Sequence, residues 1–129
     1  MCDRPSERID GEELSTQWFG KWPCFHDAEV VNLFLTRSGE SVVRIYPYYP
    51  EKPATVEFIL SGITDIELAD FSSQNVISSL GIEKTKAQYD HEVCRLTLSP
   101  CYGVAGRIDA RSLRVELLPG PSRDGGSAW

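Results

Sequence analysis

Apolar and polar residues alternate with a period of two along most of the chain, which is the spacing of strands that bury one face. This alternation predicts strands over residues 31–35, 43–45, 56–60, 66–68, 82–88, 92–98, 104–110 and 112–118. Ser38-Gly39-Glu40 lies between the first two and predicts a hairpin turn, and Gly62 predicts a second turn. Short strands at regular spacing favour an antiparallel meander, sandwich or half-open barrel.

Two segments lose the two-residue period and predict short helices. The first runs from Asp10, which forms a capping-box pattern with Glu13, to Gly20, which can end a helix. Leu14 and Trp18 would share one of its faces.

The second predicted helix covers residues 71–81. Ser72 can cap it, Val76 and Leu80 lie four residues apart, and Gly81 can end it. The expected fold class is therefore α+β, mostly antiparallel sheet with one or two short helices. The 129 residues suit one compact domain. We expect a flexible N-terminus over residues 1–8, a single β-rich domain over 9–118, and a disordered tail over 119–129.

Charge and the absence of long apolar runs narrow the possible partners. Thirteen basic and nineteen acidic residues give a net charge of -6, which repels nucleic acid and favours a basic protein or a cationic ligand. The same charge also serves solubility. No apolar run is long enough to cross a bilayer, and the first residues do not resemble a signal peptide, so we expect a cytoplasmic protein with no membrane partner.

The four cysteines lack the C-x-x-C spacing of a zinc site. In a reducing cytoplasm they are expected to be free thiols: Cys2, Cys24, Cys94 and Cys101.

The densest polar cluster is His26-Asp27-Ala28-Glu29, where an irregular segment enters the first strand. In an extended chain Asp27 and Glu29 would project from one face and could hold a cation. Together with Asp90-His91-Glu92 the cluster could supply ligands for a transition metal, but the spacing does not bring the two groups together. We favour the simpler interpretation that His26 and Asp27 hydrogen-bond neighbouring backbone and hold the loop on the sheet. We expect no metal, no cofactor and no catalytic residue.

Two surface features could bind a partner. The loop Tyr46-Pro47-Tyr48-Tyr49-Pro50 could present tyrosines to another protein, although such loops more often pack on their own sheet. Asp65 and Glu67 would lie on the outer face of a strand, and with Glu57 could meet a basic surface; an ordinary solvated face is the alternative. The candidate partner-binding residues are Glu57, Asp65, Glu67, Tyr48 and Tyr49.

Three segments carry a resemblance to a known family. Residues 19–30, FGKWPCFHDAEV, resemble the signature FG-x-W-P-S-F-H-D-A-E-V of the Immunity protein 50 family, small bacterial proteins predicted to neutralise polymorphic toxins. Residues 71–77 are similar to the family's F-x-x-Q-N-V, and residues 101–106 to its G-x-x-G segment. Cys24 stands where the signature has serine. The matching motif residues are Trp22, Pro23, Phe25, His26, Asp27, Glu29, Gln74 and Asn75.

The resemblance implies a β-rich, cytoplasmic inhibitor that is not an enzyme and that binds its cognate toxin directly. The alternative is a small-molecule- or metal-binding domain, with or without enzymatic activity, that uses His26-Asp27-Glu29. The oligomeric state, the strand order and the identity of the toxin stay open at this stage.

Overall fold

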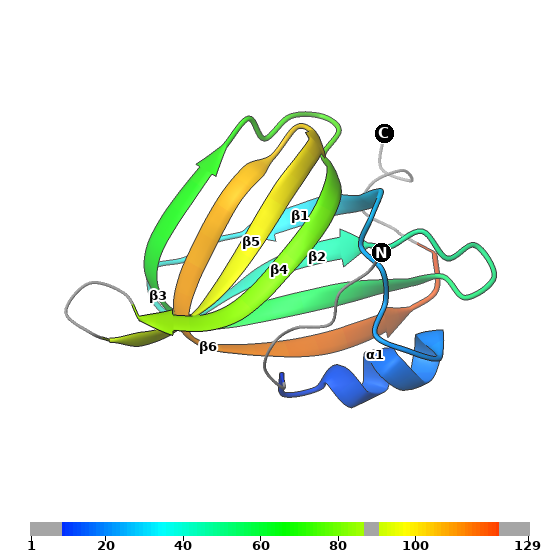
Figure 1. Cartoon of the computed structure of the whole chain (residues 1–129), viewed down its shortest axis with the longest axis horizontal. Coiled ribbons are helices and arrows are strands. Elements are labelled where there is room, and N and C mark those ends of the chain that lie inside the picture. Colours follow the sequence, from blue (N-terminus) through cyan, green and yellow to red (C-terminus); the bar gives the residue numbers. More distant parts are fainter. Residues whose placement is uncertain (1–8, 87–90, 122–129) are drawn as a thin grey trace.

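Six antiparallel strands close into a barrel, and one helix packs beside the last strand (Figure 1). The structure is a computed structural model and describes residues 9–86 and 91–121. The elements are α1 (Glu12–Phe19), β1 (Ala28–Phe34), β2 (Glu40–Tyr46), β3 (Ala54–Ala69), β4 (Val76–Lys86), β5 (Glu92–Tyr102) and β6 (Ala105–Pro119). The predicted α+β class, dominated by antiparallel sheet, is confirmed.

Two three-stranded meanders build the barrel, in the order β1-β2-β3-β6-β5-β4. β3 and β6 join them along nearly their whole length, from the pair of Ala54 with Pro119 to the pair of Ala69 with Ala105. The barrel closes between β1 and β4 through only two pairs, Ala28 with Ile77 and Glu29 with Val76.

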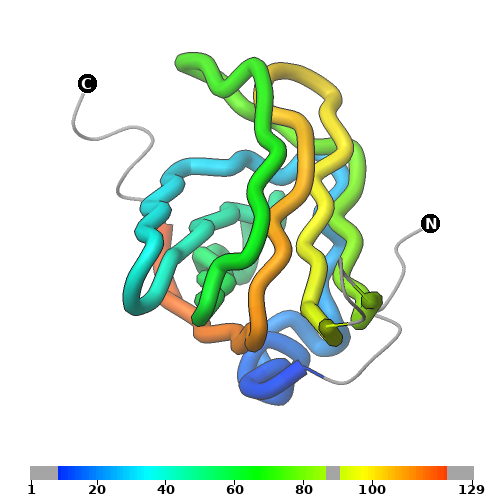
Figure 2. The backbone as a smooth tube through the Cα atoms, turned by 90° about the vertical axis from the view of Figure 1, so that its left-hand side faces the viewer, coloured from blue at the N-terminus to red at the C-terminus, as the bar shows by residue number. Residues whose placement is uncertain are grey.

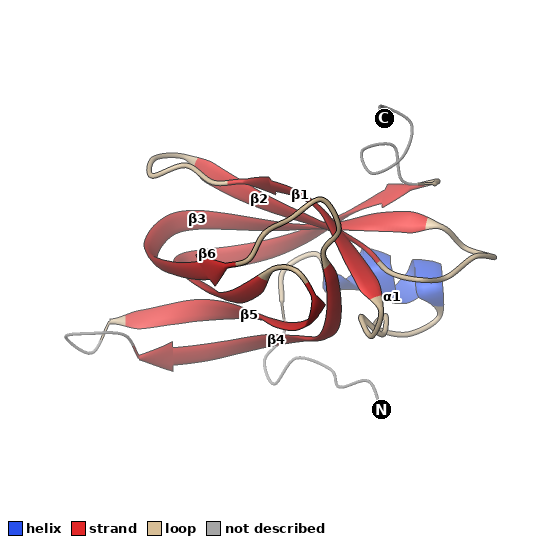
Figure 3. Cartoon of the chain, turned by 90° about the horizontal axis from the view of Figure 1, so that it is seen from above, coloured by secondary structure: helices blue, strands red, loops and turns tan. Residues whose placement is uncertain are grey.

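Beyond these two pairs β1 diverges from β4, as Figure 2 shows. In the described part of the chain, no strand pairs with residues 31–34 on that side. We call residues 31–34 the open edge of β1. In Figure 3 the β1–β2 hairpin turn lies at the opposite end of the molecule from α1.

The barrel interior is apolar, and its largest side chains are aromatic. The rings of Trp22 and Phe25 are 5.8 Å apart between centroids, and each packs on Phe58 of β3, at 6.5 Å and 5.8 Å. These separations suit tilted and edge-to-face ring packing. Other buried residues of the core include Ile9, Ala28, Val30, Val43, Ile45, Val56, Leu60, Ile77, Leu96, Leu98, Val104, Ile108 and Val115.

The predicted turn at Gly62 is wrong, because the two strands predicted around it form the single strand β3. Gly62 has a positive φ of 70°, and the pairing with β6 slips by one residue between Ile63 and Asp65. This is a β-bulge, which bends a strand without ending it. The strands predicted over 104–110 and 112–118 likewise form the one strand β6. The hairpin turn at residues 38–40 is confirmed.

The predicted helix over residues 71–81 is also wrong. Val76 begins β4, which continues through Gly81 and pairs with β5 over ten positions. The Ser72 hydroxyl donates to the carbonyl of Gln74 in a turn that precedes the strand, and does not cap a helix. Pairing with β5 thus overrides the local helical spacing, as tertiary context commonly does.

The first helix is confirmed, with Gly20 at its C-terminal end, but its start and its buried face differ from the prediction. Gly11 is the N-cap, and the side chain that reaches back is that of Glu12, which accepts a hydrogen bond from Ile9 N–H (3.0 Å). Ser15 is buried whereas Leu14 is exposed. A Cβ on Gly11 would lie 2.0 Å from the Val115 carbonyl oxygen, so glycine allows the backbone to approach β6 closely.

The folded part extends slightly into the predicted C-terminal tail. β6 ends at Pro119, and Gly120 N–H donates to the carbonyl of Pro53 (2.8 Å). The other predicted end segments, residues 1–8 and 122–129, lie outside the described residues.

Candidate functional site

The polar cluster that the sequence singles out lies in a turn that leads into β1. Ala28 N–H donates to the carbonyl of Phe25 (3.0 Å), and Asp27 has a positive φ of 66°. With its hydrogen on Nδ1, His26 donates to the carbonyl of Ser78 in β4 (3.0 Å). The imidazole therefore fastens the turn to the sheet, the role favoured from the sequence.

The prediction that Asp27 and Glu29 project from one face assumed an extended chain through residues 26–29. The structure has a turn there instead. Asp27 instead lies beside His26, with 3.6 Å between its carboxylate oxygen and Nε2. Glu29 lies within β1, between Tyr46 of β2 and Val76 of β4.

The structure does not bring the two predicted metal-ligand clusters together. His26 contacts the beginning of β4, whereas His91 precedes β5 at the far end of the β4–β5 hairpin. Asp90 lies outside the described residues. Within residues 9–86 and 91–121, no three His, Cys, Asp or Glu side chains are grouped closely enough to hold a metal ion.

Three segments that are distant in sequence converge on Asn75. Its carbonyl accepts from Val30 N–H (2.8 Å), and its side-chain Oδ1 accepts from Val104 N–H (3.0 Å) and from Ser72 N–H (2.9 Å). Its Nδ2 donates to the carbonyl of Ser72 (2.8 Å). A Cβ on Gly103 would lie 2.6 Å from Oδ1, so this position requires glycine. The segments 19–30, 71–77 and 101–106 therefore meet in space.

Three further motif residues belong to the interior of the fold. Trp22, Pro23 and Phe25 are buried, and the backbone N–H of Cys24 donates to the hydroxyl of Tyr49 (2.8 Å). Gln74 is exposed beside Asn75. The first segment therefore contributes Trp22 and Phe25 to the core.

Asn75→Ala is expected to lower the free energy of unfolding by about 2 kcal/mol, because the buried N–H of Val104 loses its acceptor. Urea denaturation measures the change. Gln74→Ala, at the exposed neighbouring position, is the matched control and should change stability by less than about 0.5 kcal/mol. Equal effects of the two substitutions would contradict the role of the Asn75 side chain.

A hollow of about 350 Å³ lies between β1 and the segment that precedes β4. We call it the β1 hollow. It is lined by Glu29, Val30, Val31, Phe71, Ser72, Ser73 and Asn75. Glu29 is the one charged residue in this lining, and its carboxylate has no hydrogen-bond or ion-pair partner among the described residues. Val30, Val31 and Phe71 make part of this lining apolar, and the free carboxylate of Glu29 suits a cationic side chain and disfavours an anion.

Two of the predicted partner-binding residues are engaged inside the protein. Glu57 is buried, and its carboxylate lies 2.6 Å from Arg44 Nε. The Tyr49 ring packs on Phe19 at 4.7 Å, and its hydroxyl binds the Cys24 amide. Tyr48, in contrast, is exposed.

Asp65 and Glu67 are both exposed on one face of β3, as predicted. Arg107 lies between them, with 2.9 Å from its Nη2 to Asp65 and 3.9 Å from its Nε to Glu67. Glu57 does not join this acidic pair, because it is buried in a separate ion pair.

The sequence does not reveal the ion cluster beneath the acidic pair. Asp109 is buried in β6, accepts two hydrogen bonds from Arg95 (2.8 and 3.0 Å), and accepts a third from Arg107 (2.9 Å). Hydrogen bonding to Asp109 raises the pKa of Arg95. Strand register places Asp65, Asp109 and Arg95 in one row across three strands. Asp109 is flanked in sequence by two apolar residues, so the sequence alone does not indicate its ion-pair partners. The strand register identifies them.

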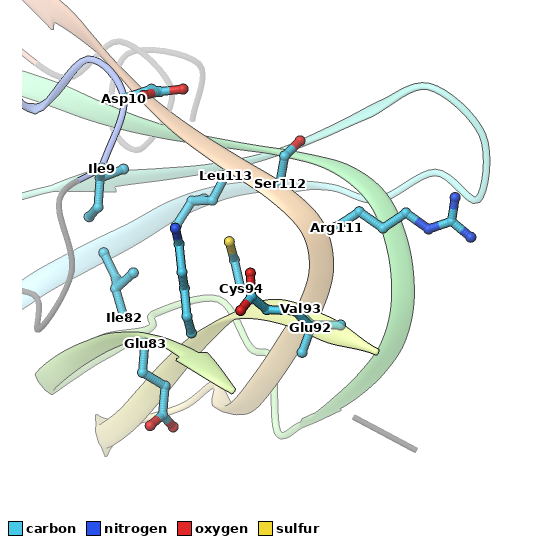
Figure 4. A pocket seen from close by; sticks show the side chains of 11 residues that line it. Ile9, Asp10, Ile82, Glu83, Glu92, Val93, Cys94, Arg111, Ser112 and Leu113 are labelled. Carbon is cyan, nitrogen blue, oxygen red and sulfur yellow. The ribbon is translucent and has the colours of Figure 1, made fainter. Parts of the chain in front are cut away.

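A second hollow, of about 190 Å³, opens where β5 and β6 separate beyond the pair of Cys94 with Ala110 (Figure 4). Ile82, Val93 and Leu113 contribute apolar side chains to it. Its charged lining residues are Asp10, Glu83, Lys84, Glu92 and Arg111. Cys94 carries a free thiol in this hollow, and burial raises the pKa of that thiol above its usual value.

Cys94 is therefore expected to react with iodoacetamide several-fold more slowly than the exposed Cys101 at pH 8, because only the thiolate is nucleophilic. Peptide mapping by mass spectrometry after timed alkylation measures both rates in one sample. The denatured chain is the control, in which the difference should disappear. Equal rates in the folded protein would contradict the protection of Cys94.

The expectation of free thiols is wrong for Cys24, which is disulfide-bonded. It holds for Cys94 and Cys101. Cys2 lies outside the described residues. Pairing of Cys24 was not apparent from the sequence because the cysteine spacings follow no recognisable framework.

Comparisons of the chain with protein-family models, curated proteins and solved structures gave no match. None of the helices described is both long and apolar enough to span a membrane.

Proposed function

We propose that this protein binds a cognate protein toxin and neutralises it by covering the toxin's functional surface, without catalysis. The observation that supports this best is the convergence of the three segments of the immunity-protein resemblance, which meet through hydrogen bonds around Asn75. Residues that belong to one family signature are expected to form one structural unit in the folded chain.

The charge of the surface supports a basic partner. The chain carries a net charge of -6, and Asp65 and Glu67 are exposed side by side with Arg107 as their shared cation. An acidic surface steers a basic protein into contact and favours the correct orientation. Tyr48 adds an exposed aromatic side chain in the β2–β3 loop.

The first experiment is capture of partners by the tagged full chain from a lysate of its source cells, followed by a growth-rescue assay on what co-purifies. A stoichiometric partner that stops growth when expressed alone, and that is harmless with this protein present, would establish toxin neutralisation. Failure to capture a candidate toxin that the cells are shown to produce would refute the proposal.

With that toxin, Asp65→Lys/Glu67→Lys is expected to weaken binding at least tenfold and to flatten its salt dependence, because two attractive charges become repulsive. Calorimetric titration at two salt concentrations measures both effects. Glu51→Lys/Glu92→Lys makes the same change in net charge at two other exposed positions and serves as the control. Unchanged affinity in Asp65→Lys/Glu67→Lys would show that these two residues do not contact the toxin.

The alternative function, a metal- or small-molecule-binding domain at His26-Asp27-Glu29, gains no support from the described residues. His26 is engaged with Ser78, and the turn separates Asp27 from Glu29. The alternative stays a prediction, which thermal melting with and without added Zn²⁺ or Mn²⁺ would test.

The cytoplasmic location is likewise a prediction. Fractionation of the source cells with an antibody against this protein would test it.

A further inference from the structure

We propose that the β1 hollow and the open edge of β1 together bind an extended, basic segment of a partner protein, which adds to the sheet as a further strand. The inference extends the proposed function, because it names the surface and the kind of segment that the toxin would offer. It rests on the proposed function only for the identity of that partner.

The open edge of β1 faces away from β2. β1 is paired on one side with β2 through Phe34, whereas on the other side its pairing with β4 ends at Glu29. A strand edge without a partner presents backbone N–H and C=O groups to any extended chain of matching register. Addition of a peptide strand to such an edge is a recurrent mode of protein recognition.

The β1 hollow lies at the point where pairing with β4 stops. Val30 N–H donates to the carbonyl of Asn75 there, and the hollow is lined by residues 29–31, 71–73 and 75. A segment lying along residues 31–34 would therefore pass the mouth of the hollow. In strand addition, backbone hydrogen bonds supply affinity, and a pocket that takes a side chain supplies selectivity.

The charge of the β1 hollow favours a basic segment. Glu29 is the one charged residue that lines the hollow, and no cation among the described residues pairs with it. A lysine or arginine of the partner would pair with this carboxylate, and the net charge of -6 attracts a basic segment to the edge. The exposed rings of Phe71, beside the hollow, and Phe34, at the end of the open edge, would cover apolar parts of the segment.

The same charges disfavour pairing between two copies of this chain. Two β1 edges brought together would place two unpaired Glu29 carboxylates in one interface, between molecules that each carry a net charge of -6. Like charges in contact across an interface are unfavourable. A basic partner is therefore the occupant that we infer.

The test uses the folded full chain and a phage-displayed library of random decapeptides. We expect enriched peptides that carry a lysine or arginine among β-branched residues. A synthetic copy of the strongest peptide should slow hydrogen exchange at those amides of residues 31–34 whose N–H groups face away from β2. Glu29→Gln should weaken its binding at least tenfold. Glu51→Gln, at an exposed position in the β2–β3 loop, is the matched control and should leave the affinity unchanged.

Several results would overturn the inference. They are the absence of enriched peptides, protection of amides elsewhere, unchanged affinity in Glu29→Gln, or a dimer that protects residues 31–34 without peptide. Once the toxin is known, the two proposals separate. Full growth rescue by Glu29→Gln would refute the role of the hollow and leave neutralisation intact. Peptide binding at the hollow in a protein that captures no toxin would refute neutralisation and keep the peptide site.

Discussion

Phe58→Ala is expected to lower the free energy of unfolding by about 4 kcal/mol, the largest effect of any substitution considered. Phe58 is 0 % exposed, and its ring packs against both Trp22 and Phe25. Alanine would leave a cavity bounded by two rings that strands and a buried turn hold in place, so the surroundings can collapse only partly. Urea denaturation followed by tryptophan fluorescence measures the change, since Trp22 belongs to the cluster.

Phe34→Ala is the matched control, because the same atoms are removed from a strand residue that is 59 % exposed. Its effect should stay below about 1 kcal/mol. Similar losses in the two variants would show that the aromatic cluster does not hold the barrel together.

Asp109→Asn is expected to lower the free energy of unfolding by about 3 kcal/mol, the second largest effect. The carboxylate accepts hydrogen bonds from Arg95 and Arg107, and its side chain is only 3 % exposed. The substitution removes the carboxylate partner of Arg95, whereas Arg107 keeps Asp65 as a partner. It also places an amide N–H₂, which can only donate, at a buried position that faces guanidinium donors. The measurement is again equilibrium unfolding in urea, at neutral pH and low salt.

Asp65→Asn provides the comparison, since Asp65 binds the same Arg107 but its side chain is 58 % exposed. Exposed ion pairs contribute between zero and about 1 kcal/mol, so this variant should remain close to the wild type. If Asp65→Asn were the more damaging substitution, burial would not be what makes the Asp109 cluster important.

The sequence predicts the fold class well because alternation is local. The strand at residues 43–45 and the hairpin turn before it follow from residues adjacent in the chain. The positions at which strands bend or continue depend on their partners. Gly62 predicts a turn, yet β6 runs opposite it without interruption, and the chain bends through a bulge. Residues 71–81 predict a helix, yet β5 offers a full set of strand pairs.

The residues around Asn75 are likewise predictable only in part, because a local motif does not show which distant segments it contacts. The sequence singles out the motif residues through a family resemblance, but their structural roles depend on tertiary contacts. Asn75 acts as a central hydrogen-bonding residue, and His26 attaches the turn to β4. The β1 hollow could not be found from the sequence, because its two walls come from segments about forty residues apart. Glu57 also needed the structure, since only register shows that it lies opposite Arg44.

The arrangement of two meanders joined along β3 and β6 implies an order of assembly. Within each meander the paired strands are neighbours in sequence, so their hairpins close short loops and can form quickly. The β3–β6 seam joins residues as distant as Ala54 and Pro119, and closing such long loops must be compensated by many contacts at once. Pairing of β1 with β4 closes a loop of about fifty residues and forms only two residue pairs. It therefore stabilises a folding nucleus less than the other strand pairings do. We expect this pairing to form last on the folding pathway and to open first when the native protein fluctuates.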